Sequence, residues 1–383
     1  MAQSAAGISL RVLTSAAAGG GRGEQLAVAC GRYVTDFGVP TFYGRVTLGE
    51  DLSLQLAREL PNSLRWADLV HVTALWSPSS LLTLALCLAP HSPLRRPLVL
   101  SPRGALLPWA LSQRAERKRA ILRVLRPLLR RVDGWHVTSD EEASALRRLR
   151  LLGPGAQLAV VGNGVQRVPE DAALSPVEQA VIERIAALPS PRIVTLGRLH
   201  PVKNLELAID GLCHLRRLPG QAQASLLIVG PERSGEGYGD RLRAQAAALG
   251  LADAVQFLGL QQGAAKDRLL ALADVLWLPS HMESFGNVVV EALAAGTPVV
   301  ASQNTPWRDL EARRVGRWVP SSAGDFALAT AGLLTLRSRR EWADHCRSVA
   351  HANYSWNARE VELRRLYEAV LSRATSAGLS ARP

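Results

Sequence analysis

The sequence predicts an α/β protein in which two domains each carry a doubly wound parallel sheet. Short apolar runs alternate with longer amphipathic segments along the whole chain, a pattern typical of βαβ units. The chain has 383 residues and so exceeds the usual size of one domain. Hydrophobic residues make up 48% of it, which is enough for two cores and unlike the composition of a disordered protein.

Cysteine usage and hydropathy predict a cytoplasmic protein. The four cysteines are widely spaced and form no C-x-x-C pair, so we expect neither a zinc site nor a disulfide framework. The longest apolar candidate, residues 80–89, is far shorter than the ~20 residues that cross a bilayer. Residues 1–7 lack the charged and apolar regions of a signal peptide.

The formal net charge of +12 indicates an anionic partner, such as nucleic acid, a lipid headgroup or a phosphorylated substrate. Between positions 105 and 131, basic residues are interleaved with leucines: Arg114, Arg117, Lys118, Arg119, Arg123, Arg126, Arg130 and Arg131. Such a segment can form an amphipathic helix on an anionic membrane. It can equally form a core-packed helix with a solvated arginine face, interrupted by Pro127. Nucleic acid is the weaker alternative, because no binding motif or aromatic interleaving is present.

The first domain should open with a strand at residues 8–14, then the glycines Gly19, Gly20 and Gly21, then an apolar helix over about residues 23–37. These glycines are not spaced as G-x-G-x-x-G, and no acidic residue follows at the distance of a dinucleotide site. We therefore expect a Rossmann-like sheet without a nicotinamide site. Further strands are predicted at residues 68–72, 97–100, 134–138 and 158–161.

A linker is predicted over about residues 166–190. The first domain would then cover residues 1–170, the second 171–355, and a last helix with its tail 356–383. Within the linker, a helix should begin at Ser175, because Pro176 suits the first helical position.

The second domain should open with a strand at residues 192–196 that leads into a glycine loop with two cations, Arg198 and Lys203. These two side chains would suit a diphosphate, because arginine binds bidentately and lysine acts as a point charge. The alternative is a pair of solvated basic residues. Together with Gly197, the glycine of the loop, they mark a candidate anion site.

A second candidate anion site lies in the turn around Glu283. The peptide N–H groups of residues 285–287 fall at the start of a predicted helix, where donors lack partners and the dipole favours anions. Glu283 precedes these N–H groups and Glu291 lies one turn into the helix. The site would therefore suit a ligand with a phosphate at the N–H groups and hydroxyl groups on either side of it, such as a sugar nucleotide. The alternative is an ordinary βαβ unit with Glu291 near the helix dipole.

The residues of this turn and the following helix resemble the E-x7-E signature of retaining glycosyltransferases of family 4. The stretches that carry the resemblance are Glu283-Ser284-Phe285-Gly286-Asn287, Glu291-Ala292-Leu293, Ala295-Gly296 and Pro298-Val299-Val300-Ala301-Ser302. In the first half, Leu75-Trp76-Ser77-Pro78, Ser101-Pro102-Arg103-Gly104 and Asn163-Gly164-Val165 are similar to family stretches. Three positions depart from the pattern. Arg103 stands where many members have histidine and is no general base, Gly162 replaces a proline, and Asn204 replaces a frequent glycine.

The resemblance implies the GT-B architecture, with two Rossmann-like doubly wound domains facing across a cleft. It implies transfer of a sugar from a nucleotide-sugar donor to an acceptor hydroxyl with retention, in lipopolysaccharide, capsule or exopolysaccharide synthesis. The implied catalytic residues are Glu283, Arg198, Lys203 and Arg103. The implied donor-binding residues are Glu291, Ser284, Phe285, Gly286, Asn287, Gly197, Gly230, Pro231, Leu260, Gly20 and Gly21. No D-x-D triad occurs, so neither a metal nor another cofactor is expected.

Several questions stay open on the sequence. Glu283 could be a nucleophile or a stabiliser of an oxocarbenium-like state. A sugar-nucleotide epimerase on the same fold and a non-catalytic relative are rival interpretations. The acceptor is a glycan or lipid-linked sugar, and a peripheral contact with the inner face of the membrane would suit the basic helix. Trp76 and Trp109 could stack on sugar rings, although buried packing is the alternative for both.

Overall fold

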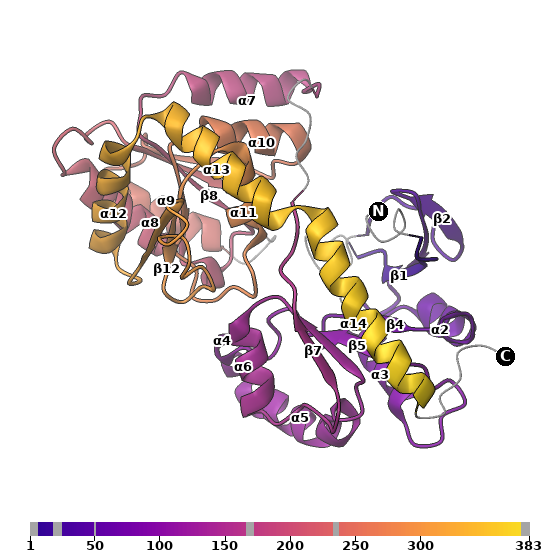
Figure 1. Ribbon diagram of the computed structural model, residues 1–383. Helices are drawn as coiled ribbons and strands as arrows, with labels where there is room; N and C mark the ends of the chain where they lie inside the picture. The colour runs from indigo at the N-terminus through magenta and orange to yellow at the C-terminus, as the bar shows by residue number, and fades with distance from the viewer. Residues whose placement is uncertain (1–6, 18–24, 50, 166–171, 233–236, 377–383) are drawn as a thin grey trace. The chain divides into compact units, whose positions relative to one another are not determined.

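The computed structural model describes residues 7–17, 25–49, 51–165, 172–232 and 237–376. The chain forms two compact units. Unit 1 comprises Met1–Gly162 together with Asn357–Pro383, and unit 2 comprises Asn163–Trp356. Helices and parallel strands alternate in both units (Figure 1), as the sequence predicts.

Unit 2 is built on a six-stranded parallel sheet with the order β10-β9-β8-β11-β12-β13. The strands are β8 Arg192–Leu196, β9 Ser225–Val229, β10 Val255–Gly259, β11 Val275–Leu278, β12 Val299–Ser302 and β13 Gly316–Val319. Numbered along the chain this order is 3-2-1-4-5-6, which is the common order of doubly wound nucleotide-binding folds. The strands are continuous apolar runs because helices cover both faces, and all four residues of β11 and of β12 are buried.

Helices flank this sheet on both sides (Figure 1). They are α7 Pro176–Ala186, α8 Leu205–Arg216, α9 Tyr238–Ala248, α10 Gly263–Leu272, α11 Asn287–Ala295, α12 Ala323–Leu336 and α13 Arg339–Tyr354, with a short 3₁₀ helix η1 at Pro201–Lys203. α8 packs against α9 and α12, whereas α10 packs against α7 and α11. α7 begins as predicted: Ser175 and Glu178 form a capping box and Pro176 occupies the first turn.

Unit 1 holds two sheets. The strands β4 Val70–Thr73, β5 Leu98–Ser101, β6 Gly134–Val137 and β7 Gln157–Val160 are parallel and pair in chain order. The strands β1 Val12–Ser15, β2 Tyr33–Asp36 and β3 Val39–Gly44 form a smaller sheet with the order β1-β3-β2. The helices are α2 Leu54–Trp66, α3 Pro78–Leu88, α4 Pro108–Ser112, α5 Ala115–Leu129 and α6 Asp140–Arg148, and the long C-terminal helix α14 spans Trp356–Ser376.

α14 packs directly on the parallel sheet of unit 1. Leu366 and Val370 on the helix form a buried cluster with Val99 of β5. A Cβ atom on Gly134 would lie 2.7 Å from Cγ2 of Val370, so only glycine at this position of β6 allows the helix to approach so closely. The C-terminal segment is thereby an integral part of the unit 1 core.

The predicted helix over residues 23–37 is wrong for the residues that the structure describes. Tyr33–Asp36 is instead the strand β2, antiparallel to β3. Phe37 and Gly38 connect the two strands with φ values of 46° and 75°, which is the positive-φ pair that a two-residue hairpin loop requires. The aromatic and β-branched residues of β2 favour a strand. Gly19, Gly20 and Gly21 lie outside the described residues.

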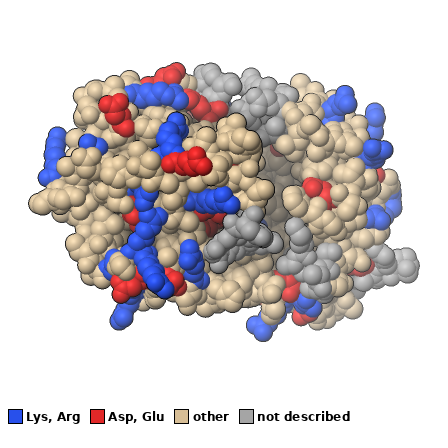
Figure 2. All heavy atoms as spheres, turned by 90° about the horizontal axis from the view of Figure 1, so that it is seen from above, with Lys and Arg blue, Asp and Glu red and all other residues tan. Residues whose placement is uncertain are grey.

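The basic segment forms α4 and α5, and the expected interruption at Pro127 is wrong. Pro127 lies within the last turn of α5, and the break falls instead at Arg114, which has φ 54°. Leu122 and Leu129 of α5 are buried. The arginines that face solvent are Arg117, Arg119, Arg123 and Arg126, with Arg130 and Arg131 following. On the face of the molecule drawn in Figure 2, by comparison, Lys and Arg lie interspersed with Asp and Glu. Among the described helices, none combines the length and hydropathy needed to cross a bilayer.

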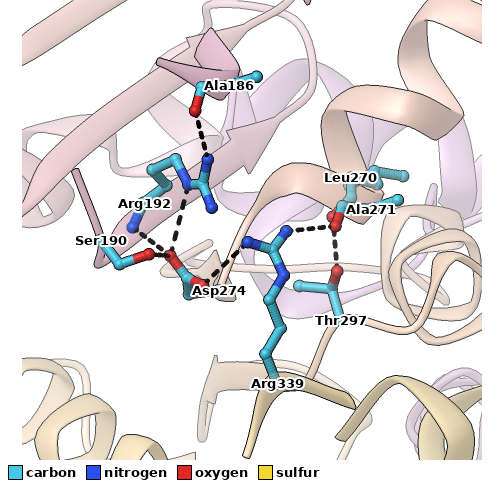
Figure 3. A network of polar contacts seen from close by, with 8 residues as sticks. All are labelled: Ala186, Ser190, Arg192, Leu270, Ala271, Asp274, Thr297 and Arg339. Carbon is cyan, nitrogen blue, oxygen red and sulfur yellow. Dashed lines mark hydrogen bonds and ion pairs between the residues drawn. The ribbon is translucent and has the colours of Figure 1, made fainter. Parts of the chain in front are cut away.

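Asp274, just before β11, anchors the amino-terminal edge of the unit 2 sheet (Figure 3). Its carboxylate accepts hydrogen bonds from the Arg192 backbone N–H at 2.7 Å and the Ser190 hydroxyl at 2.9 Å. The guanidinium of Arg339, at the start of α13, lies 3.4 Å from it, and Nε of Arg192 lies 3.6 Å away. Arg192 and Arg339 also donate to the carbonyls of Ala186 and Ala271. The network therefore ties α7, β8, α10 and α13 together.

Candidate active site

The candidate site of unit 2 lies at the carboxyl ends of β8 and β11, which are neighbours in the sheet. In this strand order the chain leaves the two strands toward opposite sides, and this switch point is where open α/β sheets generally bind their ligands. The loops after β8 and β11 are joined to each other. The His281 N–H donates to the Val202 carbonyl at 2.9 Å, and the Asn204 side chain donates to the Pro279 carbonyl at 3.2 Å.

Lys203 and Glu283 form an ion pair where these loops meet. Nζ of Lys203 lies 2.6 Å from Oε1 of Glu283, and the two side chains are 21% and 12% exposed. The same carboxylate oxygen accepts a hydrogen bond from the buried hydroxyl of Ser280 at 2.8 Å. The structure thus brings two residues that are 80 positions apart into one polar centre, and it adds Ser280, which the sequence pattern did not identify.

Two glycines lie next to this ion pair. A Cβ atom on Gly197 would lie 3.0 Å from Cε of Lys203, and one on Gly230 would lie only 1.9 Å from the Gly197 carbonyl oxygen. Both glycines have φ near 150°. Their N–H groups are already bonded, to the Val229 and Gly259 carbonyls. A side chain at either position would collide with Lys203 or with the Gly197 backbone, so the two glycines allow close packing beside Lys203 and do not contribute free donors.

The start of α11 is the third part of the site. Gly286 caps the helix with φ 86°, and no side chain caps its first N–H groups, which leaves donors for an anion. A Cβ atom on Gly286 would lie 3.1 Å from Nε1 of Trp307 and 3.5 Å from Cγ of Glu283. Trp307 donates to the Phe285 carbonyl at 2.5 Å, and its ring packs between Phe285 and Tyr354 at centroid distances of 5.2 and 5.7 Å. An aromatic cluster thus holds the helix start rigidly.

Glu291 is paired with a lysine that the sequence reasoning missed. Nζ of Lys266, on α10, lies 2.8 Å from Oε1 of Glu291, and the two side chains are 22% and 23% exposed. No sequence motif links the two positions. The packing of α10 against α11 brings them together, so the pair could be found only once the arrangement of these helices was known.

The other predicted residues of unit 2 are placed around these centres. Arg198 is exposed and makes no hydrogen bond or ion pair with another residue that the structure describes. Asn287 is exposed, and its carbonyl accepts from the Asn163 side chain at 2.6 Å. Ser284 and Pro231 are half-buried, and Leu260 is 56% exposed after β10. Gly20 and Gly21 fall outside the described residues.

Arg103 belongs to unit 1, where it follows the carboxyl end of β5 with φ 52°. Burial lowers the pKa of its guanidinium, and the nearby Glu142 and Tyr367 act in the opposite direction. Glu142 is itself 2% exposed and accepts hydrogen bonds from the N–H and hydroxyl of Thr138, each at 2.8 Å, and from the Gly104 N–H. Arg103 is therefore a largely buried cation beside a fully hydrogen-bonded carboxylate.

In the part of the chain that the structure describes, no three His, Cys, Asp or Glu side chains come together as a metal-binding group. The charged groups of the candidate site are two lysine–glutamate pairs and one exposed arginine. A doubly wound sheet with this arrangement at its switch point belongs to the class of nucleotide-binding α/β folds.

Comparison with known sequences identifies the family. Residues 181–348 match the glycosyl transferases group 1, and residues 2–164 match the glycosyl transferase 4-like domain. The two matches together extend over both units. The chain therefore belongs to the group 1, family 4 glycosyltransferases, a class of enzymes, as the E-x7-E resemblance predicts.

Curated relatives and a solved structure agree with this assignment. The chain is 35% identical over 187 residues to the D-inositol 3-phosphate glycosyltransferase of Nocardia farcinica (strain IFM 10152), covering 47% of this chain and 41% of that protein. It is 34% identical over 253 residues to the phosphatidyl-myo-inositol mannosyltransferase of Mycobacterium leprae (strain TN), covering 64% and 62%. The matched part is thus less than two thirds of either relative. The structure of HepE from Anabaena in complex with UDP and glucose superposes with a TM-score of 0.68 at 22% identity, covering 87% of each chain. This similarity confirms the predicted GT-B fold.

Proposed function

We propose that the protein transfers a hexose from a nucleotide-sugar donor to an acceptor hydroxyl, with retention of the anomeric configuration. The observation that carries the proposal is the Lys203–Glu283 pair at the switch point of unit 2, where Gly197 and Gly230 allow the backbone to pack closely beside the lysine. The relatives are named as glycosyltransferases, and HepE was solved with UDP and glucose bound. Both facts support a donor of this chemical class.

The donor diphosphate would lie between the loop after β8 and the start of α11. Arg198 has a guanidinium that faces solvent and can bind a phosphate bidentately. Lys203 supplies a second positive charge, and the uncapped N–H groups at residues 287–288 supply a third. Together these groups offset the charge that develops on the departing nucleotide. We propose that they do so without a metal ion or any other cofactor.

The two glutamates would then bind the hydroxyl groups at either end of the diphosphate. Glu291 accepts from the ribose, and the ion pair with Lys266 orients that carboxylate. Glu283 accepts from the sugar hydroxyls near the reacting carbon, and its negative charge stabilises the positive charge of an oxocarbenium-like transition state. Trapping of a covalent glycosyl-enzyme would assign Glu283 as a nucleophile, and the absence of such a species would leave the stabilising role.

The acceptor is proposed to be a glycan or lipid-linked sugar of surface polysaccharide synthesis, bound on the side of unit 1. The outward face of α5 supports a peripheral contact with an anionic membrane at the inner leaflet, because its arginines are exposed while Leu122 and Leu129 pack inward. Sedimentation with vesicles tests this contact. Binding to anionic but not neutral vesicles should be lost in Arg117→Glu/Arg123→Glu and kept in the control Arg217→Glu/Arg340→Glu, which removes as many exposed charges from unit 2.

The transfer reaction is tested with a panel of nucleotide sugars in the presence of a chelator. We expect one donor to be hydrolysed slowly without an acceptor and ~10-fold or more faster with the right acceptor. Proton NMR of the first-formed product should show the anomeric configuration of the donor. Interconversion of one nucleotide sugar into another without acceptor would instead support the epimerase alternative, which the family assignment disfavours.

A further inference from the structure

A continuous chain of hydrogen bonds runs through unit 1 from the C-terminal helix to the far strand of the parallel sheet. The Tyr367 hydroxyl of α14 lies 2.7 Å from Nδ1 of His71 on β4. Nε2 of His71 lies 2.8 Å from Oγ of Ser101, the last residue of β5, and the same oxygen lies 2.8 Å from Nδ1 of His136 on β6. Nε2 of His136 lies 2.9 Å from the Val161 carbonyl, which directly follows β7.

Only one arrangement of protons satisfies every member of this chain. The Val161 carbonyl can only accept, so His136 carries its proton on Nε2 and accepts on Nδ1 from the Ser101 hydroxyl. The oxygen of Ser101 must then accept from Nε2–H of His71. Nδ1 of His71 in turn accepts from the Tyr367 hydroxyl. All donors point from α14 toward β7, and both imidazoles are neutral.

The surrounding charges enforce this neutral state. Burial is the main cause that lowers the pKa of His71 to about 3 and that of His136 to about 4, and the positive charge of Arg103 contributes to both shifts. The positive charge of each imidazolium would also oppose the other, since the rings are 5.4 Å apart. Glu142, the buried carboxylate near Arg103, already accepts three hydrogen bonds from Thr138 and Gly104. The cluster therefore accommodates one cation, and that cation is Arg103.

We propose that Tyr367 is a positioning residue that, through His71, Ser101 and His136, holds the guanidinium of Arg103 in one orientation at the carboxyl end of β5. The physical argument is that a proton-ordered chain has a single low-energy arrangement. Arg103 follows Ser101 by two residues, and its charge acts on both imidazoles, so the chain fixes the polar environment of the guanidinium. Tyr367 contributes from α14 and therefore makes the C-terminal helix part of the arginine site. A role of Arg103 in binding a phosphate-bearing ligand rests on the proposed function. The proposal that Tyr367 orients Arg103 is independent of that function.

The chain would remain ordered in the folded protein without any ligand, so its test needs no substrate. In protein selectively labelled with ¹⁵N-histidine and ¹⁵N-arginine, both imidazoles should show the Nε2–H tautomer, and the Arg103 Nε–H signal should be sharp. Tyr367→Phe keeps the ring and removes only the hydroxyl. We expect it to broaden or shift the Arg103 signal and to mix the tautomers of His71, whereas His136 keeps Nε2–H because its carbonyl partner is unchanged.

Tyr33→Phe is the matched control. The Tyr33 hydroxyl is also hydrogen-bonded within unit 1, to Ser63 at 2.8 Å and Glu59 at 3.1 Å, but it is not part of the chain. This variant should leave the Arg103 and histidine signals as in the wild type. Ser101→Ala should disturb both histidines, because it breaks the chain at its centre. An Arg103 signal in Tyr367→Phe that equals the wild-type signal, or an equal change in Tyr33→Phe, would overturn the proposal.

A kinetic experiment separates this inference from the proposed function. Once a donor is found, Tyr367→Phe should lower kcat by about 10-fold, or 1.4 kcal/mol, while the affinity for the donor stays within 2-fold, because the donor residues are in unit 2. A change in donor affinity with unchanged kcat would contradict the positioning role. If no nucleotide sugar binds to the wild type, the proposed function fails, and the NMR comparison alone still decides whether Tyr367 positions Arg103.

Discussion

Two carboxylates lie at opposite ends of β11 and illustrate two uses of a buried charge. Asp274 precedes the strand and is held by three residues, Ser190, Arg192 and Arg339, and its side chain is 8% exposed. Glu283 follows the strand, and its carboxylate is held by one hydroxyl and one lysine in the loops of the proposed donor site. The amino edge of a parallel sheet serves stability, whereas its carboxyl edge serves binding. If this comparison is correct, substitution of Asp274 should mainly lower stability, whereas substitution of Glu283 should mainly lower turnover.

Asp274→Asn is expected to give the largest loss of stability. The change leaves Arg192 and Arg339 without their counter-charge, and breaking a buried ion pair from one side costs about 3–5 kcal/mol. Chemical denaturation should show this loss, while the turnover per folded molecule stays near that of the wild type. Asp309→Asn is the control, because its pair with Arg313 is 40% and 36% exposed and should contribute less than about 1 kcal/mol. Equal losses in the two variants would contradict the structural role of Asp274.

Glu283→Gln should have the opposite signature. The amide keeps the size of the side chain and can still accept from Ser280 and Lys203, and it leaves one cation without its counter-charge instead of two, so the unfolding free energy should fall by less than in Asp274→Asn. The lost negative charge should lower kcat by about 10²–10³-fold, the usual effect of removing one electrostatic contact to a transition state. Glu311→Gln is the control, because among the described residues its carboxylate accepts only a long backbone bond, from Trp318 at 3.4 Å. A Glu283→Gln enzyme of normal kcat would place the chemistry elsewhere.

Lys266→Met tests whether the second lysine–glutamate pair shares the binding role. Without Lys266, the Glu291 carboxylate loses its ion pair and its fixed orientation, and we expect donor affinity to fall by about 3- to 10-fold, up to 1.4 kcal/mol. Calorimetric titration with the nucleotide measures this affinity. Lys118→Met removes the lysine of unit 1 whose ammonium donates to the Ala110 carbonyl and should leave donor affinity unchanged.

The smallest effect concerns the imidazoles of unit 1, and it appears only in acid. His71 and His136 have pKa values below the ordinary 6.5, at about 3 and about 4. Between pH 6.5 and these values the unfolded chain binds protons that the folded chain excludes, so the unfolding free energy falls as the pH falls. Each group contributes up to about 1.4 kcal/mol per pH unit. His71→Gln should reduce the slope between pH 6 and pH 5, and an unchanged slope would show that His71 is not buried in neutral form.

The sequence predicted the frame of the fold because its signals are local. Alternating apolar runs locate the parallel strands, and Ser175-Pro176 locates the start of α7. The hairpin of β2 and β3 was missed because its short strands fit a helical pattern as well, and the positive φ of Phe37 is not visible in its identity. The break at Arg114 was missed for the same reason: left-handed backbone at a non-glycine residue is set by packing.

The candidate site was predictable only in part. Glu283, Lys203 and the glycines were identified through a family pattern, and no local rule pairs residues 80 positions apart. Lys266 and Tyr367 carry no motif, and they reach Glu291 and His71 through tertiary packing between helices and strands. Paired charges and ordered hydrogen-bond chains depend on such long-range contacts, so they emerge from the structure rather than from spacing.

The most direct test of the account is calorimetric titration of nucleoside diphosphates and nucleotide sugars into the protein in the presence of a chelator. The account predicts that one nucleotide binds without metal and that Lys203→Ala weakens binding by ~10-fold or more, about 1.4 kcal/mol. Arg340→Ala, which removes an exposed cation elsewhere in unit 2, should bind as the wild type does. If no nucleotide binds, or if both variants bind equally well, the carboxyl edge of the unit 2 sheet is not a donor site.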